Sequence, residues 1–367
     1  MKDIITHKTR RVLYPIALIY GWIMTFRNFL FDNGTLRSRS FNIPVISIGN
    51  ITVGGTGKTP HIEYLIEFLK KDYKIAVLSR GYKRKSKGFV LADAKTSMFD
   101  IGDEPYQMLQ KYPDITVAVD RDRCHGIEEL QARVKGLQII LLDDAYQHRY
   151  VRPLVNILLV DYHRLICKDL MLPAGDLREP EVGKNRAQIV LITKCPRDIN
   201  PIDYRIIVKH MDLFPYQRMY FTTFRYKGLR LLFGEKNIPL YPMSWLKKKN
   251  ILLLTGIASP VNMLNELRQY TKVKSLSFGD HHEFSVQDIQ RVTNAFLKLP
   301  EANRIVVTTE KDAVRLVGLT FLPSLLKEHL YVLPIGVEFM QDQEDTFNHK
   351  IIGYVRKNKR NSSISLQ

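Results

Sequence analysis

The sequence has few cysteines, ordinary numbers of glycine and proline, and no long hydrophobic run. Its three cysteines, Cys124, Cys167 and Cys195, lie far apart in 367 residues and form no metal-type pair, which argues against a disulfide framework and against a zinc finger. The 17 prolines and 20 glycines exclude a collagen-like or low-complexity chain. With 45% hydrophobic residues, the chain can instead bury the cores of about two domains.

Acidic residues are also in short supply. The chain has 37 Asp and Glu against 55 Lys and Arg, which gives a formal net charge of +18. Such a surplus favours an anionic partner, namely nucleic acid, an anionic membrane or a phosphorylated substrate, while a basic surface that only aids solubility is the alternative. The charge alone leaves the partner open.

The N-terminal region contains a charge-free apolar segment, residues 12–26, with basic residues on both sides. Its fifteen residues fall short of the 18 or so that a spanning helix needs. Residues 1–43 carry seven Lys and Arg and two Asp, a net charge of +5. We therefore predict that residues 1–40 form a hydrophobic and basic helix at the interface of an anionic membrane. A buried core helix and a true span are the alternatives.

Apolar, β-branched runs alternate with helical stretches along the rest of the chain, as expected for an α/β fold with a mostly parallel sheet and helices on both faces. The strands predicted for the first domain are residues 44–48, 73–78, 115–119, 138–142, 155–160 and 188–192. A smaller second α/β domain has predicted strands at residues 251–254, 273–278, 304–308 and 331–333. The predicted boundaries are 1–40 for the N-terminal helix, 41–218 for the first domain, 219–234 for an extended connector, 235–356 for the second domain and 357–367 for a frayed polar tail.

The most informative motif follows the first strand. A glycine-rich turn ends in Gly-Lys-Thr and opens a helix. Glycines let backbone N–H groups face phosphate oxygens, and the helix N-terminus adds partial positive charge. In such a P-loop the lysine reaches the β and γ phosphates and the Ser/Thr hydroxyl binds Mg²⁺. One departure is that the first glycine of the general pattern is Thr52. The predicted nucleotide-binding residues are Thr52, Val53, Gly54, Gly55, Thr56, Gly57, Lys58 and Thr59.

Two carboxylates end a later apolar strand. Asp143 and Asp144 follow the run Ile139–Leu142, and ligands of open α/β sheets bind at the carboxyl ends of strands. Together with Thr59, these two residues are therefore the predicted Mg²⁺ ligands. A GTPase of this class would carry an Asp where this chain has Pro196, after Thr193 and Lys194. This difference favours ATP.

Phosphoryl transfer to an alcohol needs a base near the acceptor hydroxyl and cations around the phosphoryl oxygens. Asp103 and Glu104 lie in a Gly-Asp-Glu-Pro segment that is also typical of an ordinary helix start. Asp280-His281-His282 is a second candidate for the base. Candidate arginines for a substrate phosphate are Arg80, Arg121, Arg123 and Arg178, and the sequence does not rank them.

In this order, the motifs resemble those of the tetraacyldisaccharide 4′-kinases, the lipid A 4′-kinases of Gram-negative bacteria, over nearly the whole chain. The residues that carry the resemblance are the N-terminal hydrophobic segment, Gly49 to Pro60, Ser79 to Tyr82, Gly102 to Pro105, Asp143 to Arg149, Pro173 to Pro180, Thr193 to Pro196, Asp280-His281 and Thr308 to Leu316. The Thr at position 52 is usual for this family.

The resemblance implies transfer of the ATP γ-phosphate to the 4′-hydroxyl of a tetraacylated glucosamine disaccharide 1-phosphate, by a peripheral enzyme on the cytoplasmic face of the inner membrane. It assigns the base role to Asp103, assisted by His281 from the second domain, and so implies domain closure. It places Glu104, His148 and Arg178 near the site with less defined roles; Arg80, Tyr82 and Arg121 are further substrate candidates. No nucleic-acid partner is expected. The alternatives are another P-loop NTPase, such as a GTP-dependent maturation factor, and a nucleic-acid-binding ATPase.

Overall fold

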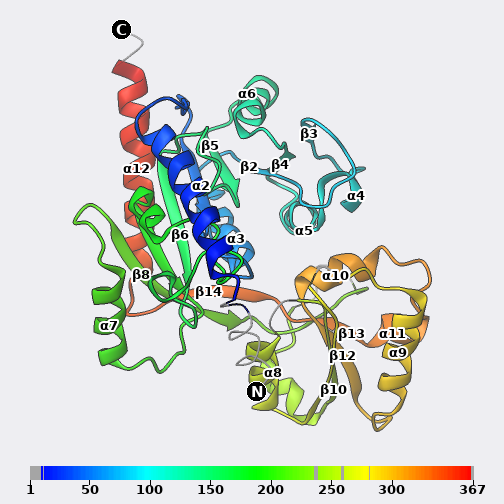
Figure 1. The fold of residues 1–367 in the computed structure, drawn as a ribbon. Coiled ribbons are helices and arrows are strands. Elements are labelled where there is room, and N and C mark those ends of the chain that lie inside the picture. Colours follow the sequence, from blue (N-terminus) through cyan, green and yellow to red (C-terminus); the bar gives the residue numbers. More distant parts are fainter. Residues whose placement is uncertain (1–9, 11, 235–238, 258–259, 281, 365–367) are drawn as a thin grey trace. The chain divides into compact units, whose positions relative to one another are not determined.

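The computed structural model describes residues 10, 12–234, 239–257, 260–280 and 282–364. The chain divides into two compact units (Figure 1). Unit 1 comprises Met1–Phe224 and Val337–Gln367, and unit 2 comprises Arg225–Gly336.

Unit 1 is built on a sheet with strand order β14-β8-β7-β6-β1-β5-β2-β4-β3. Neighbouring strands from β8 to β4 in this order pair in parallel, and β3 runs antiparallel to β4. Its strands are β1 Val45–Gly49, β2 Ile75–Ser79, β3 Val90–Leu91, β4 Thr116–Val119, β5 Ile139–Asp143, β6 Val155–Asp161, β7 Ile189–Thr193, β8 Arg218–Tyr226 and β14 Ile335–Phe339. The helices are α2 Tyr14–Asp32, α3 Lys58–Leu69, α4 Met98–Ile101, α5 Asp103–Lys111, α6 Arg123–Arg133, α7 Pro201–Met211 and α12 Glu344–Ile364, with short 3₁₀ turns at Ile166–Lys168 and Glu181–Arg186.

The two faces of this sheet are packed differently. One face carries a single hydrophobic cluster in which Ile46 and Ile48 of β1 meet apolar residues of α3, α5 and α12. On the other face the core is divided into two clusters, one around Leu158 and α7 and one around Leu142 and α6. Ser47 of β1 and Asn156 of β6 are paired neighbours and belong to neither cluster, because their side chains are polar.

Unit 2 has the strand order β11-β10-β12-β13-β9. Its strands are β9 Arg230–Leu231, β10 Asn250–Thr255, β11 Val273–Ser277, β12 Arg304–Thr308 and β13 Leu330–Val332. Its helices are α8 Val261–Arg268, α9 Val286–Leu297, α10 Glu310–Val317 and α11 Ser324–His329, with a 3₁₀ turn at Met243–Lys248. The α/β fold predicted from the sequence is confirmed, and the predicted strands lie within two residues of those observed.

The division of the chain differs from the predicted boundaries. The first half of the expected connector 219–234 lies in β8, which pairs with β7 through residues such as Tyr220 and Phe221. The second unit begins at Arg225, and the chain returns to unit 1 at Val337. The expected frayed tail is helical up to Ile364, because α12 packs on unit 1 through Phe347, Ile351 and Val355. Residues 365–367 lie outside the described part of the chain.

Candidate functional site

The phosphate loop turns at two left-handed glycines after a fully buried strand. β1 ends at Gly49, and the backbone adopts positive φ at Gly54 (101°) and Gly57 (86°) before α3 begins at Lys58. A Cβ atom at Gly57 would also lie 2.9 Å from the Phe224 ring, so glycine is needed there for space as well as for φ. The loop thus leads into the N-terminus of α3, a geometry suited to phosphate.

Thr52 replaces the first glycine of the general pattern because another segment supports the loop there. Thr52 is buried and forms an antiparallel bridge with Leu177. The Val53 N–H donates to the Asp176 carbonyl at 2.7 Å, and Asn50 Nδ2 donates to the Thr52 carbonyl at 2.9 Å. The segment 176–178 therefore holds the first half of the loop in place, where a tight glycine turn would otherwise be required.

Lys58 lies among charges from two other segments. Its Nζ is 3.6 Å from Asp144 Oδ1 and 3.4 Å from Asn50 Oδ1, and Arg178 Nη1 is 3.9 Å from Asp144 Oδ2. These separations exceed the roughly 2.7–2.9 Å of a short charge-assisted hydrogen bond. The structure thus places Lys58, Asp144 and Arg178 close together without short hydrogen bonds between them.

Asp143 is buried at the end of β5. Ser79 Oγ donates to Asp143 Oδ2 at 3.1 Å. Burial, followed by the negative charges of Glu104 and Asp144, raises the pKa of Asp143 to about 7, against the lowering effects of Lys58 and the Ser79 hydrogen bond. A cation beside Asp143 would favour its carboxylate form.

The Gly-Asp-Glu-Pro motif forms the start of α5. Asp103 and Glu104 occupy its first turn after Gly102 (φ 90°), and the Glu104 N–H donates to Asp103 Oδ1 at 3.0 Å. A Cβ atom at Gly102 would lie 2.8 Å from the Tyr82 carbonyl oxygen. The close backbone approach permitted by Gly102 therefore brings the start of α5 against the loop after β2, and the effect of Glu104 on Asp143 connects it to the end of β5.

The other predicted substrate residues lie around the same edge of the sheet. His148 and Arg121 line a cavity of about 560 Å³. Burial, followed by the charge of Arg123, lowers the pKa of His148 to about 4, with Arg80 also contributing. His148 is therefore neutral near pH 7, and its buried Nε2 has no hydrogen-bond partner. The ring of Tyr82 is 59% exposed.

The predicted histidine partner of Asp103 lies in unit 2. His281 is outside the described residues, so its predicted assistance to Asp103 has no structural description. The neighbouring Asp280 lies 3.7 Å from Lys311 Nζ through Oδ1. His282 Nε2 lies 2.9 Å from Asp288 Oδ2, within the capping box of α9. His282 therefore has a structural contact of its own at the start of that helix.

Sequence reasoning did not identify Thr193 and Lys194 as residues that hydrogen-bond to carbonyl groups of the phosphate loop. Lys194 (φ 58°) follows β7, donates to the Gly55 carbonyl and lies 2.7 Å from Asp161 Oδ2 through its Nζ. Thr193 Oγ1 donates to the Thr56 carbonyl at 2.9 Å. The only sequence signal for this role is the position of Thr193 and Lys194 directly after an apolar strand, where parallel strands bring loops together.

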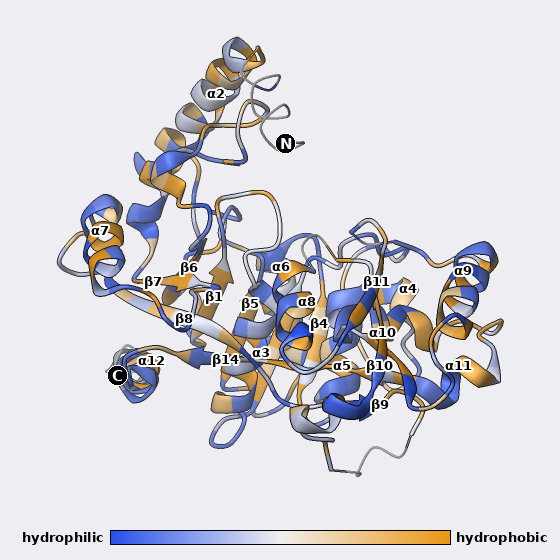
Figure 2. Cartoon of the chain, turned by 90° about the horizontal axis from the view of Figure 1, so that it is seen from below, coloured by the Kyte–Doolittle hydropathy of each residue, from blue (hydrophilic) through white to orange (hydrophobic). Residues whose placement is uncertain are grey.

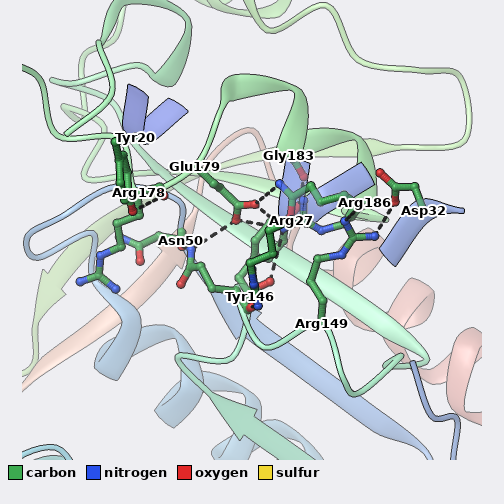
Figure 3. A network of polar contacts seen from close by, with 12 residues as sticks. Tyr20, Arg27, Asp32, Asn50, Tyr146, Arg149, Arg178, Glu179, Gly183 and Arg186 are labelled. Carbon is green, nitrogen blue, oxygen red and sulfur yellow. Dashed lines mark hydrogen bonds and ion pairs between the residues drawn. The ribbon is translucent and has the colours of Figure 1, made fainter. Parts of the chain in front are cut away.

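A second polar cluster, here called the Glu179 network, comprises Asn28, Gln147, Glu179 and Arg186. Figure 3 shows Glu179 and Arg186 facing each other in it. The Glu179 side chain is fully buried and accepts hydrogen bonds of 2.9 Å at both oxygens from Arg186 Nη2. Asn28 Nδ2 donates to Glu179 Oε2 at 3.3 Å, and Gln147 Nε2 donates to the Asn50 carbonyl. The network therefore joins α2 to the first residue of the phosphate loop.

The protein supplies some of the oxygen ligands that Mg²⁺ needs. Among the described residues, no group of three or more His, Cys, Asp and Glu side chains is arranged to hold a metal ion. Mg²⁺ usually binds one or two carboxylates together with substrate phosphates and water. Asp144 Oδ1 is buried without a hydrogen-bond partner. Asp143 precedes it in the chain, and Thr59 is the hydroxyl residue of the phosphate-loop motif. The residues fit Mg²⁺ bound in company with a nucleotide.

Comparison with known proteins identifies the family of the chain. The family model described as "Tetraacyldisaccharide-1-P 4'-kinase" matches residues 9–355. The chain belongs to this kinase family. It is 57% identical over 362 residues to the tetraacyldisaccharide 4'-kinase of Phocaeicola vulgatus, covering 98% of each chain. It is 55% identical to that of Bacteroides thetaiotaomicron, covering 98% of this chain and 96% of the relative.

A solved structure of the family shows the same architecture. LpxK from Aquifex aeolicus, described as an "apo" form in complex with ATP, is 29% identical with a TM-score of 0.74, covering 95% of this chain and 99% of that one. The family expected from the motifs is thus confirmed, and so is an ATP-dependent kinase that acts on a hydroxyl group. Neither a GTP-dependent maturation factor nor a nucleic-acid-binding ATPase is favoured by these matches.

Proposed function

We propose that this protein transfers the γ-phosphate of ATP, bound with Mg²⁺, to the 4′-hydroxyl of tetraacyldisaccharide 1-phosphate in lipid A biosynthesis. The observation that carries the proposal is the convergence of Lys58, Asp144 and Arg178 beside a phosphate loop that opens α3. Family membership supplies the acceptor class. The residues around the loop supply the charges that phosphoryl transfer needs.

Each residue has a proposed task in this reaction. Lys58 and the N-terminus of α3 neutralise charge on the transferring phosphoryl group. Asp103 accepts the proton of the sugar hydroxyl, with assistance from His281. Mg²⁺ held by Thr59, Asp143 and Asp144 would neutralise the nucleotide phosphates. The residues proposed to contact or orient the acceptor are Arg80, Tyr82, Glu104, Arg121, His148 and Arg178.

A kinase assay tests the proposed reaction. The purified chain is incubated with the acceptor lipid in mixed micelles and with either ATP or GTP, with and without Mg²⁺. We expect transfer of one phosphate to the 4′ position with ATP and Mg²⁺, and far slower transfer with GTP. Efficient phosphorylation of another acceptor while the disaccharide lipid stays unmodified would contradict the proposal.

The exposed face of α2 supports a peripheral attachment to an anionic membrane. Trp22 is 80% exposed, and Figure 2 shows hydrophobic stretches along this helix. None of the helices in the described part of the chain is long and apolar enough to cross a membrane. The inner face of α2 is meanwhile docked on unit 1 through Tyr20, Arg27 and Asn28. The exposed apolar residues of α2 and the turn before it are Val12, Leu13, Tyr14, Ile16, Leu18, Ile19, Trp22, Ile23, Phe26 and Phe29.

Vesicle flotation tests this attachment, which we place on the cytoplasmic face of the inner membrane. The variant Trp22→Ser/Ile23→Ser should leave anionic vesicles, because it removes exposed apolar area from α2. The matched control is Ile202→Ser/Val208→Ser, which removes exposed apolar side chains from α7. Equal flotation of the two variants would contradict the assignment to α2.

A further inference from the structure

A polar cavity of about 720 Å³ lies on the divided face of the sheet in unit 1. Its lining includes Ser47 of β1 and Asn156 of β6, which separate the two hydrophobic clusters of that face. The turn after α2 and the segment 145–153 contribute further lining residues. The cavity is therefore a feature of the fold, created where polar residues replace core residues on two adjacent strands.

No residue of the phosphate loop lines the cavity. Leu142 and His148 line it on the side of the carboxyl end of β5, whereas its other end lies farther from the loop. Asn156 is the second residue of β6, and Gln188, which also lines the cavity, directly precedes β7. The phosphate loop follows the carboxyl end of β1. Because β1, β6 and β7 run parallel, the start of β6 and β7 lies at the opposite edge of the sheet from the phosphate loop.

Four arginines and one aspartate are among the residues that line the cavity. Arg149 is paired with the aspartate, Asp32, and Arg186 is paired with Glu179. Arg37 and Arg152 are exposed and have no carboxylate partner among the described residues. These two arginines leave the cavity with uncompensated positive charge, and a guanidinium group binds phosphate oxygens in a bidentate manner.

The floor of the cavity offers unpaired hydrogen-bonding groups. Ser47 Oγ and Asn156 Oδ1 are buried and have no hydrogen-bond partner, while the two residues are only 1% and 9% exposed. The Ser47 hydroxyl can donate to an anionic oxygen, whereas the Asn156 amide oxygen accepts a hydrogen bond and so suits a hydroxyl group of the ligand. Buried polar groups of this kind normally have partners, so the floor suits a ligand that carries both oxygen anions and hydroxyls.

From this arrangement we infer that the cavity binds a phosphate ester carried on a small hydroxylated group. Arg37 and Arg152 bind the phosphate, and Ser47 and Asn156 contact the hydroxylated part. The carrier is either the headgroup of an anionic phospholipid or a soluble phosphate ester of the same chemistry. The first source agrees with the position of Phe31 and Asp32, since the end of α2 lines the cavity and the exposed apolar side chains lie along the same helix.

The test compares two double variants with the same loss of charge. Arg37→Gln/Arg152→Gln removes the unpaired arginines of the cavity. Arg197→Gln/Arg205→Gln removes two exposed arginines elsewhere in unit 1 and serves as the control. All four positions are exposed, so both variants should fold, and circular dichroism and ATP binding check this. The probes are glycerol 3-phosphate, measured by calorimetry, and phosphatidylglycerol vesicles, measured by flotation.

Two results would support the inference and identify the source. In the first result, glycerol 3-phosphate binds the unmodified protein and the control equally well, and it binds the cavity variant at least tenfold more weakly. The cavity then takes a soluble ester. If only vesicle binding falls, and falls at least fivefold further in the cavity variant than in the control, the ligand is a lipid headgroup. If the two variants behave alike with both probes, the inference is overturned and the cavity holds water only.

Discussion

The charges beside the phosphate loop and the charges of the Glu179 network differ in distance and in burial, although Arg178 and Glu179 are neighbours in the sequence. Arg178 Nη1 is 3.9 Å from Asp144 Oδ2, and both side chains are about one-third exposed (34% and 32%). Glu179 is fully buried and accepts two hydrogen bonds of 2.9 Å from Arg186. Two neighbouring residues therefore differ: Arg178 has a long, partly exposed ion pair, and Glu179 is buried in a short one.

This difference separates two tasks of one segment. Long, partly exposed contacts leave Arg178 and Asp144 able to exchange their partner for a substrate phosphate at little cost. The buried pair contributes little net stability when compared with an apolar core, but removing one partner is costly. Substitutions beside the loop should therefore change the reaction, and substitutions in the network should change folding.

The largest effect is expected at Asp103. Asp103→Ala should lower kcat by about 10²- to 10⁴-fold, the usual contribution of general base catalysis. ATP affinity should be retained, because the phosphate loop is not altered. Steady-state kinetics and nucleotide titration measure the two quantities. Asp114→Ala is the control, since Asp114 is exposed and paired only with Lys70 among the described residues, and near-normal turnover of Asp103→Ala would contradict the assignment.

The Glu179 network can be broken at its centre. Glu179→Ala should lower the free energy of unfolding by about 3–5 kcal/mol, because Arg186, whose side chain is only 19% exposed, is then left without its carboxylate. The comparison variant Glu128→Ala breaks an exposed pair with Arg39 and should cost about 0–1 kcal/mol. Denaturant unfolding measures both. Similar losses in the two variants would show that burial does not set the cost here.

Arg178 sharpens the contrast with its neighbour. Arg178→Ala should lower turnover by about 10²-fold, as for loss of one charged group that stabilises the transition state. Its free energy of unfolding should change by less than about 1 kcal/mol, because its ion pair is long and partly exposed. Kinetics and denaturant unfolding of the same preparation separate the two effects. A loss of stability as large as that of Glu179→Ala would remove the distinction between the two residues.

The smallest effect at neutral pH concerns His61, whose side chain contacts the end of the phosphate loop. Its Nδ1 is 2.7 Å from the Gly57 carbonyl oxygen, and its Nε2 is 2.9 Å from Thr222 Oγ1. Burial lowers the pKa of His61 from 6.5 to about 4. Between these pH values the unfolded chain binds a proton that the folded chain does not, so stability falls as the pH falls, by about 1.4 kcal/mol per pH unit at most.

The variant His61→Asn tests this pH dependence. Its free energy of unfolding should fall less steeply than that of the unmodified protein between pH 6.5 and pH 4. Asp143, with its raised pKa, contributes the opposite slope in both proteins, so it cancels in the difference. If the free energy of unfolding depends on pH in the same way in both proteins, the predicted effect of burial on the pKa of His61 is contradicted.

Sequence reasoning located the residues whose chemistry is local. The glycines and Lys58 of the phosphate loop follow a fully buried strand, and the carboxylates of Asp143 and Asp144 lie at the end of another. Both patterns depend on strand burial and turn geometry over a few residues, which the sequence displays directly. The same holds for the exposed apolar face of α2, because helical spacing and flanking charge are local properties.

Residues that act through distant partners were not found in this way. The pairing of Thr52 with Leu177 and the contact of Lys194 with Gly55 each join segments more than a hundred residues apart. The boundaries of unit 2 also differ from the predicted 235–356. α12 packs on unit 1, and no local sequence pattern indicates this packing. Such contacts depend on strand order, which a single sequence does not display.

The amino-acid sequence by itself therefore determined the α/β class, the nucleotide loop, the family and the basic, apolar character of the N-terminal region, since each depends on periodicity or on a short motif. Only the tertiary structure decided that Arg178 faces Asp144 while Glu179 is buried against Arg186. It also decided that Ser47 and Asn156 line one cavity with unpaired arginines. The reason is physical, because distance, burial and hydrogen-bond partners are properties of packed segments. The net charge of +18 likewise does not show which arginines are paired and which line a cavity.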